Sequence, residues 1–458
     1  MAHSAHIDKL VRLLTRRPAG SPTIVAELGI SQPTFSRLWA TIKEGVALGA
    51  GRGRQYALRR HVPGVGASIP VFRIGEDGVA GAVGQLEPLQ TGFYALTQLE
   101  GRGYRLFEGM PFFLRDLRPQ GFLGRMAPGR NRDLELPNDI LMWTDEHVLK
   151  YISRRSEHAA GDLILGNESY ARYLAQGAAM LHRPVLDPDR ADLYPGMAEH
   201  AMQGEPPGSS AGGEQPKFAV AVQRGAGPET TEHVIVKFSP GVAAPSGRRW
   251  ADLLICEHLA LEVLARNRIA AASTSILESG GRVFLEVVRF DRLGLKGRLP
   301  MATFSALDGD LGMMDQNWTC VAGELERLGQ LSRQDITTVE QLDLYGALIG
   351  NTDRHHGNIA VAWTFDKPYR LLPAYDMLPM LYRPTAHGEI VAREWVPDLG
   401  AKLALRHLPL CHRMAVEFWS DVVASPIVSD GFKHDVAARH LGTLHGLNPG
   451  LTIRQTSA

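Results

Sequence analysis

The chain has 458 residues, of which 44% are hydrophobic and 21% are charged, and its formal net charge at pH 7 is zero. This length predicts two or three domains. No apolar run approaches the ~18 to 20 residues of a membrane span, and the amino terminus lacks the pattern of a secretion signal. Three widely spaced cysteines are typical of reduced thiols. We therefore expect a cytoplasmic protein with no membrane partner.

The charge is distributed unevenly along the chain. Residues 1–62 carry ten Lys and Arg against three Asp and Glu, so the remainder is net acidic by the same amount. This asymmetry predicts that residues 1–62, called the head below, bind an anion, and that the rest of the chain, called the body, is neutral to acidic. Such a head could place the protein at the nucleoid within the cytoplasm.

The basic head has the pattern of a winged helix-turn-helix domain. A helix over 5–17 is followed by a second that opens at Ser21 or Pro22 and ends near Gly29. A third helix opens at Ser31 or Gln32 and runs to about residue 42. The segment 46–58 then reads as a hairpin with a Gly/Arg tip, which resembles a wing. We assign residues 1–62 to this domain and 63–69 to a linker.

Double-stranded DNA is the expected partner of this head. Arg37 and Lys43 lie on or just after the presumed recognition helix, and Arg52 and Arg54 lie at the tip of the wing. Trp39 is more consistent with a core position. A solvated basic turn is the alternative for the two wing arginines, whose flanking glycines favour phosphate or minor-groove contact.

The middle of the chain alternates between strand and helix patterns. Short antiparallel strands are expected over 70–135, and the segment 111–121 leads into helical segments that continue to about residue 180. A Gly/Ser-rich loop at 204–217 separates them from four further strands and one helix, after which helices dominate from residue 301. These elements are predicted at 218–223, 233–238, 249–266 (the helix), 274–277 and 282–288.

Several segments of this region suit phosphate and nucleotide binding. The loop that contains Gly212, Gly213 and Gln215 could direct backbone N–H groups at an anion, with Lys217 adding a positive charge. Lys237 closes an apolar strand, as does the lysine that pairs nucleotide phosphates in kinases. A flexible surface loop and a solvent-facing lysine are the alternatives. Asp252 and Glu257 are both possible partners of Lys237.

The segment 286–292 ends a strand with an abrupt change to charged residues. In a kinase, such a connecting segment offers backbone groups to adenine and an acid to the ribose. Val288, Phe290 and Asp291 would suit these contacts, and a plain strand followed by a turn is the alternative.

The strongest pattern is Asp353, Asn358 five residues later, and Asp376 eighteen residues after that. In phosphoryl transfer, one carboxylate orients a hydroxyl nucleophile, while an amide oxygen and a second carboxylate hold Mg²⁺ against the ATP phosphates. The spacing resembles the protein-kinase catalytic loop. For His355 we expect a structural or nucleotide-contacting role, and for His356 a surface position, since adjacent histidines point apart and have no third ligand nearby.

Together these motifs make the chain, from about residue 70 to its end, resemble the HipA family of bacterial serine/threonine kinases, the toxin halves of toxin–antitoxin pairs. The resemblance rests on a set of short motifs, none of which is specific alone. They are Pro-Phe-Phe-Leu at 111–114, Leu-Arg-Pro-Gln-Gly at 117–121, Ala-Gly-Asp-Leu at 160–163, Ser-x3-Glu-Gln-Pro-Lys at 210–217, Val-Lys-Phe at 236–238, Arg-Phe-Asp-Arg at 289–292, Gly-Asn-Thr-Asp-Arg-His at 350–355 and Pro-Ala-Tyr-Asp at 373–376.

The resemblance implies that Asp353 is the catalytic base, that Asn358 and Asp376 bind magnesium, and that Lys237 pairs with ATP phosphates under the 210–217 loop. It also implies autophosphorylation at Ser210, with Ser209 as the adjacent alternative. A phosphate there would add about −1.5 to −2 charges and could displace the loop. The implied target is a component of translation, such as an aminoacyl-tRNA synthetase.

The predicted fold is α+β: a bilobal HipA or protein-kinase-like body preceded by the winged helix-turn-helix domain. Its α/β amino-terminal lobe would span 70–295 and its helical carboxy-terminal lobe 296–458. Val288 replaces the family's usual acid, and the fused DNA-binding head puts the need for a separate antitoxin partner in doubt. Two other functions stay open: a DNA-binding regulator whose kinase-like body only phosphorylates itself, and a small-molecule kinase.

Overall fold

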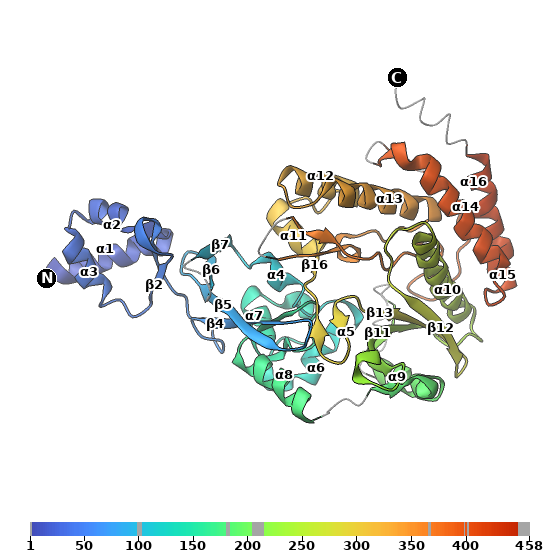
Figure 1. The fold of residues 1–458 in the computed structure, drawn as a ribbon, viewed down its shortest axis with the longest axis horizontal. Coiled ribbons are helices and arrows are strands. Elements are labelled where there is room, and N and C mark those ends of the chain that lie inside the picture. The colour runs from blue at the N-terminus through green and yellow to red at the C-terminus, as the bar shows by residue number, and fades with distance from the viewer. Residues whose placement is uncertain are drawn as a thin grey trace, which may run out of the picture. The chain divides into compact units, whose positions relative to one another are not determined.

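The computed structural model describes residues 2–98, 103–179, 184–203, 215–364, 368–397, 399–400 and 403–447. The chain has a mixed α+β fold and divides into two compact units (Figure 1). The first contains Met1–Arg118 with Asn131–Leu181, and the second contains Pro119–Arg130 with His182–Ala458.

The first unit begins with three helices and a small antiparallel sheet. The helices are α1 (Ala2–Arg16), α2 (Ser21–Leu28) and α3 (Gln32–Trp39), and the sheet has the order β1 (Ala19–Gly20), β3 (Gln55–Leu58), β2 (Gly45–Leu48). Gly29 ends α2 with a φ of 65°, a conformation that favours glycine. Ser31 caps α3 by accepting a hydrogen bond from Thr34 N. The helix boundaries lie within a few residues of those expected from the sequence.

Apolar faces of these helices form the core of the segment. Leu10, Leu14, Ile24, Phe35 and Leu38 are all buried in one cluster. Trp39 packs edge-on against the Tyr56 ring at 4.8 Å, which confirms the prediction that it is a core residue.

A second sheet in this unit contains five antiparallel strands. Its order is β7 (Tyr104–Glu108), β6 (Phe93–Gln98), β5 (Ala80–Pro88), β4 (Ile69–Ile74), β8 (Leu163–Leu165). The main helices around it are α4 (Phe112–Arg115), α7 (Asp145–Arg155) and α8 (Asn167–Ala179). The antiparallel strands predicted over 70–135 are therefore confirmed as far as residue 108, whereas short helices lie between residues 112 and 134.

The second unit is built on another five-stranded sheet. Its order is β12 (Thr274–Ser279), β13 (Arg282–Val288), β11 (Thr231–Phe238), β10 (Lys217–Gln223), β9 (Val185–Leu186), and only the β10–β9 pair is parallel.

Successive residues of a strand point to opposite faces of the sheet. On one face, Val236 and Phe284 pack with Tyr194 of α9 (Arg190–Met202), and residues of α5 (Gly121–Arg125) join the same core. On the other face lies α10 (Pro245–Arg266), which contacts β11, β12 and β13.

The remainder of the second unit is mainly helical. Short strands β14 (Arg292–Leu293) and β15 (Gly297–Arg298) pair with each other, and β16 (Ala302–Thr303), β17 (Ala360–Ala362) and β18 (Arg370–Leu371) form a three-stranded sheet. The helices are α6 (Ala127–Arg130), α11 (Phe304–Leu311), α12 (Trp318–Arg327), α13 (Arg333–Ile349), α14 (Leu408–Ala424), α15 (Asp430–Phe432) and α16 (Ala438–Gly446). Long helix α13 packs between α12 and α14 and ends at the segment that carries Asp353.

Within the described parts of the chain, none of the helices has the length and apolar character needed to cross a membrane.

Candidate active site

Lys237 lies at the centre of a buried cluster of charges. It stands near the end of β11, and its Nζ donates to both carboxylate oxygens of Glu257 on α10, at 2.6 and 2.7 Å. The same Nζ also donates to Oδ1 of Asp376. The side chains of Lys237 and Glu257 are almost completely buried. The sheet, α10 and the segment after β18 therefore meet at one lysine.

The structure decides which acid pairs with Lys237, a question the sequence left open. Asp252 accepts hydrogen bonds instead from the backbone N and the hydroxyl of Ser429, at 2.8 and 2.6 Å. Glu257 is thus the partner, and Asp252 joins α10 to the segment that begins α15.

Lys217 brings a second cation to the same face. It lies directly opposite Lys237 in the β10–β11 pair, so both side chains leave the sheet in the same direction. Like charges in such a pair repel each other, and the carboxylates of Glu257 and Asp376 offset that repulsion. Lys217 is partly exposed, so its ammonium group can bring positive charge to a phosphate group beside the buried, paired Lys237.

These neighbours change the protonation equilibria of the cluster. Burial would lower the pKa of Lys237, but the charges of Asp376 and Glu257 outweigh it and raise that pKa. Burial would raise the pKa of Asp376, but the charges of Lys237 and Lys217 hold the pKa of this carboxyl below its ordinary value. Lys237 is therefore a cation and Asp376 an anion throughout the neutral pH range.

The segment that carries Asp353 is held by side-chain amides. Gly350 ends α13 with a φ of 81°, and Asn351 follows in a buried position. Asn351 Oδ1 accepts from Asp353 N at 2.9 Å, and Asn358 Nδ2 donates to Asp353 O at 2.9 Å. Both sides of the Asp353 peptide backbone are thus fixed, while its carboxylate is partly exposed.

Asp376 sits in an unusual backbone conformation. Its φ is 52°, a left-handed value that non-glycine residues seldom adopt. Such strain is found where surrounding contacts over-determine it, often at functional positions. Here Lys237 holds the carboxylate, and Asn351 Nδ2 donates to the Asp376 carbonyl at 3.4 Å.

The residues after Asp353 anchor the loop to its surroundings. Arg354 donates to the buried Asp343 of α13 at 3.1 Å, and Trp318 Nε1 donates to His355 O at 3.0 Å. His355 is exposed, and its Nδ1 accepts a hydrogen bond from Gly357 N at 3.0 Å. His356 is buried and contacts Gln316 O at 2.9 Å. The predicted surface position of His356 is therefore wrong, because its ring packs between the loop and α11.

The predicted adenine-binding segment is linked to this loop through aromatic rings. Phe290 packs against Tyr375 with 5.6 Å between ring centroids, and the Tyr375 hydroxyl donates to Gly357 O at 2.7 Å. Val288 N donates to Ser273 O at 2.9 Å. Asp291 is buried and accepts from Arg289 at 2.7 Å and from its neighbour Arg292 at 2.6 Å. The ribose contact predicted for Asp291 stays a prediction.

The predicted phosphate-covering loop is described only at its end. Lys217 is the first residue of β10, and Gln215 lies two residues before it. Gly212, Gly213 and both predicted phosphorylation sites, Ser209 and Ser210, lie outside the described residues.

The donor set at the loop suits magnesium. Asn358 commits its amide nitrogen to Asp353 O, so its Oδ1 is the atom left to ligate a cation. Asp376 supplies carboxylate oxygens, and its side chain is 25% exposed. Magnesium in phosphoryl-transfer enzymes is usually held by one or two such oxygens together with substrate phosphates. Among the described residues there is no group of three or more His, Cys, Asp or Glu that could hold a metal alone.

Tertiary contacts also assign importance to residues that the sequence patterns did not single out. Asn351, Asp343 and Tyr375 all hold the loop, yet none of them belongs to the Asp–Asn–Asp spacing. Asn351 stands within a motif that resembles the family, and that position was the available signal. Asp343 gave no signal beyond being one of the acids within α13.

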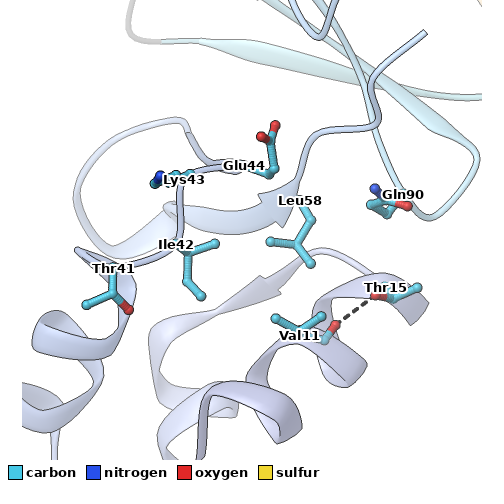
Figure 2. Close-up of a pocket in the computed structure, with 8 residues that line it drawn as sticks. All are labelled: Val11, Thr15, Thr41, Ile42, Lys43, Glu44, Leu58 and Gln90. Carbon is cyan, nitrogen blue, oxygen red and sulfur yellow. Dashed lines mark hydrogen bonds between the residues drawn. The ribbon is translucent and has the colours of Figure 1, made fainter. Parts of the chain in front are cut away.

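The four predicted DNA-contacting residues, Arg37, Lys43, Arg52 and Arg54, are all exposed. Figure 2 shows a hollow beside Lys43, in which the Thr15 hydroxyl donates to Val11 O at 2.8 Å. The hollow is lined by residues of α1, the segment after α3, β3 and one residue after β5, and none of them is a predicted catalytic or ATP-binding residue. The lining consists of Val11, Thr15, Thr41, Ile42, Lys43, Glu44, Leu58 and Gln90.

Comparison with protein families gives two matches that together span most of the chain. Residues 65–174 match the YjjJ-like toxin middle domain, and residues 209–423 match the HipA-like C-terminal domain. Toxin YjjJ of Escherichia coli (strain K12) is 35% identical to the chain over 437 residues, which cover 93% of this chain and 95% of that protein.

Two solved structures are similar at low sequence identity. One is the Shewanella oneidensis MR-1 toxin–antitoxin complex of HipA, HipB and operator DNA, with a TM-score of 0.44 and 12% identity over 82% of this chain and 96% of that chain. The other is the Helicobacter pylori proinflammatory kinase CtkA, with a TM-score of 0.35 and 14% identity over 50% of this chain and 87% of that chain.

Proposed function

This chain belongs to the HipA-like toxin family, with a middle region of the YjjJ-like type, and on that basis we propose that it is an ATP- and magnesium-dependent serine/threonine protein kinase. The observation that carries the proposal is that one buried lysine, Lys237, binds both Glu257 and Asp376. This arrangement joins the predicted phosphate-binding strand to the predicted metal ligand.

In the proposed reaction, the Asp353 carboxylate accepts the proton of a Ser or Thr hydroxyl. The hydroxyl oxygen forms a bond to the γ-phosphorus, and the bond from that phosphorus to the bridging oxygen breaks, which leaves ADP. Lys237 and Lys217 place positive charge at the phosphates and orient them. Bound magnesium, held by Asn358 and Asp376, would neutralise the charge that develops on the phosphate oxygens.

The cluster has the charges that this chemistry requires. The raised pKa of Lys237 and the lowered pKa of Asp376 keep one a cation and the other an anion at neutral pH. The fixed backbone of Asp353 positions its carboxylate without occupying it. Pre-positioned groups of this kind supply most of the rate enhancement in phosphoryl transfer.

Transfer of radiolabel from ATP tests this proposal. The wild type is expected to label itself or a protein in a cell lysate. Asp353→Ala and Asp376→Ala should each lower the rate on the order of 10³-fold, because each raises the activation barrier by several kcal/mol. A folded wild type that labels neither itself nor any lysate protein would refute the kinase.

For targets and partners we follow the family resemblance. The proposed acceptor is a protein of the translation machinery, such as an aminoacyl-tRNA synthetase, and the proposed autophosphorylation site is Ser210 or Ser209. An antitoxin is the proposed protein partner. Phosphoproteomics after induced expression would identify the acceptor, and an inactive Asp353→Ala protein is its control.

A second proposed activity is DNA binding by a winged helix-turn-helix head over residues 1–62. It is supported by the three helices and three-stranded sheet, and by the exposure of Arg37, Arg52 and Arg54. If this were the main function, the body would serve only as a self-phosphorylating regulatory module.

Binding to double-stranded DNA at several salt concentrations tests the second activity. The affinity should fall steeply with salt because phosphate contacts release counterions. The pair of changes Arg52→Ala and Arg54→Ala should weaken binding and flatten the salt dependence. The exposed Arg333 of α13, changed to Ala, is the matched control. Unchanged affinity in the wing variant would reject the assignment.

A further inference from the structure

We propose that Asn351 is a positioning residue that couples the catalytic base to the metal-binding turn. Its one amide group holds the backbone of Asp353 and the backbone of Asp376 at the same time. This inference rests on the proposed kinase function, because it assigns Asn351 a task in that reaction.

The geometry of Asn351 is specific to its amide. Its Oδ1 accepts from Asp353 N at 2.9 Å, and its Nδ2 donates to Asp376 O at 3.4 Å. The same nitrogen lies 3.6 Å from the sulfur of Met377. A side-chain amide carries its acceptor and its donor on two separate atoms, so it can hold two backbone groups at once. An aspartate of the same shape would keep the acceptor and lose the donor.

Asn351 is itself held in place and does not move freely with the loop. It is 1% exposed, and its backbone N donates to Gly346 O at 2.8 Å in the last turn of α13. Its carbonyl accepts from Arg354, which also binds the buried Asp343. The amide is therefore fixed to the rigid end of a long helix.

The strain at Asp376 explains why a fixed donor is needed there. A left-handed backbone at a non-glycine residue is strained and persists only where contacts enforce it. The bond from Asn351 is one such contact, and the bond from Lys237 to the carboxylate is the other. Without Asn351, the Asp376 carbonyl loses its hydrogen bond to the end of α13. The distance between the segments that carry Asp353 and Asp376 is then no longer fixed by this amide.

The alternative is that Asn351 only satisfies buried backbone groups and supports stability. The two roles differ in what they change. A purely structural amide would affect the melting temperature and leave the chemistry of the folded fraction intact. A positioning residue would lower kcat and metal affinity in protein that remains folded, while ATP binding without metal persists through Lys237 and Lys217.

The test compares Asn351→Asp and Asn351→Ala with the wild type as full chains. Both variants should lower kcat and the apparent affinity for magnesium by roughly 10–100-fold, the usual effect of losing a group that orients a metal ligand. The affinity for ATP measured without metal should be little changed. Melting temperatures identify which of the two variants is folded, and Asn351→Asp keeps the side-chain volume.

Asn267→Asp is the matched control. Asn267 also donates through its amide to a backbone carbonyl and to a second acceptor, Val263 O at 2.9 Å and Glu417 at 3.0 Å, at the far end of α10. Its change should lower stability and leave kcat and magnesium affinity unaltered. Equal kcat and magnesium dependence in wild type and folded Asn351→Asp would overturn the inference.

Failure of the proposed kinase is distinguishable from failure of this inference. If the wild type transfers no phosphoryl group to any protein, the kinase proposal fails, and manganese binding measured by electron paramagnetic resonance decides the role of Asn351. Weaker manganese binding by Asn351→Asp, by roughly 10–100-fold, supports the coupling. Equal binding, or no binding by the wild type, overturns it.

Discussion

Two carboxylates in the second unit lie close to the same sheet and have opposite surroundings. Glu286 of β13 is on the α9 face and is completely buried. It accepts from Arg190 and Tyr194 at 2.8 and 2.6 Å, and from Arg224 and Ser275 at 2.7 and 2.8 Å. Asp376 meets Lys237 on the α10 face, is partly exposed and has a strained backbone.

The comparison shows how burial and the number of hydrogen-bond donors distinguish a carboxylate that only stabilises the fold from one that can still bind a ligand. Four donors saturate Glu286, so its carboxylate has no capacity left for a ligand. Asp376 has a lysine as its charged partner and keeps contact with solvent, so a cation can approach it. Both carboxyls have a lowered pKa, which therefore does not distinguish the two roles.

The largest expected effect on stability comes from removing the saturated acid. Glu286→Ala leaves Arg190 and Arg224 buried or half-buried without this partner, and breaking a buried ion pair costs about 3–5 kcal/mol. Urea unfolding measures this loss. Per folded molecule, phosphoryl transfer should be retained, and a large loss of kcat with unchanged stability would contradict the comparison.

The next effect is a dependence of stability on acid pH. Burial would raise the pKa of Glu286, but hydrogen bonds from Arg190, Tyr194 and Arg224 lower it to about 2. Because the folded pKa lies below the unfolded value, the stabilisation is complete above about pH 4.5 and is lost as the pH falls through about 2.

The loss of folding stability from protonation of Glu286 is roughly 3 kcal/mol between about pH 4.5 and pH 2. Unfolding free energies of wild type and Glu286→Gln, measured from neutral to acid pH, check it. The wild type should lose stability more steeply than the variant. Parallel curves would show that Glu286 titrates alike in the folded and unfolded chains.

The smallest expected effect on stability comes from a change at Asp252, which can be compared with a change at Glu257, the other acid of α10. Asp252→Asn should cost about 1–2 kcal/mol, because it weakens two hydrogen bonds from Ser429 that end on a charged group. Its phosphoryl-transfer rate should be unchanged. Glu257→Gln, the matched change at the partner of Lys237, should lower that rate. A variant pair with the reverse effects would reassign the partner of Lys237.

Spacing along the chain was sufficient to propose part of the candidate site. Asp353, Asn358 and Asp376 could be named because only short loops and strands separate them along the chain. Lys237 could be named because it lies near the end of an apolar strand. Asp252 and Glu257 could not be ranked. Five helical residues apart, they point about 140° away from each other, and the sequence does not say which direction faces the sheet.

The sequence by itself determined the three helices before residue 42, the strands and helix between residues 217 and 288, and the candidate Asp–Asn–Asp spacing, because these depend on local periodicity, caps and turns. Only the tertiary structure decided that Glu257 holds Lys237, that His356 is buried and that Asn351 joins Asp353 to Asp376. Each of these contacts depends on the packing of elements distant in sequence. The packing of the whole core sets the direction in which each of these side chains points and how deeply it is buried. No local sequence pattern encodes that packing.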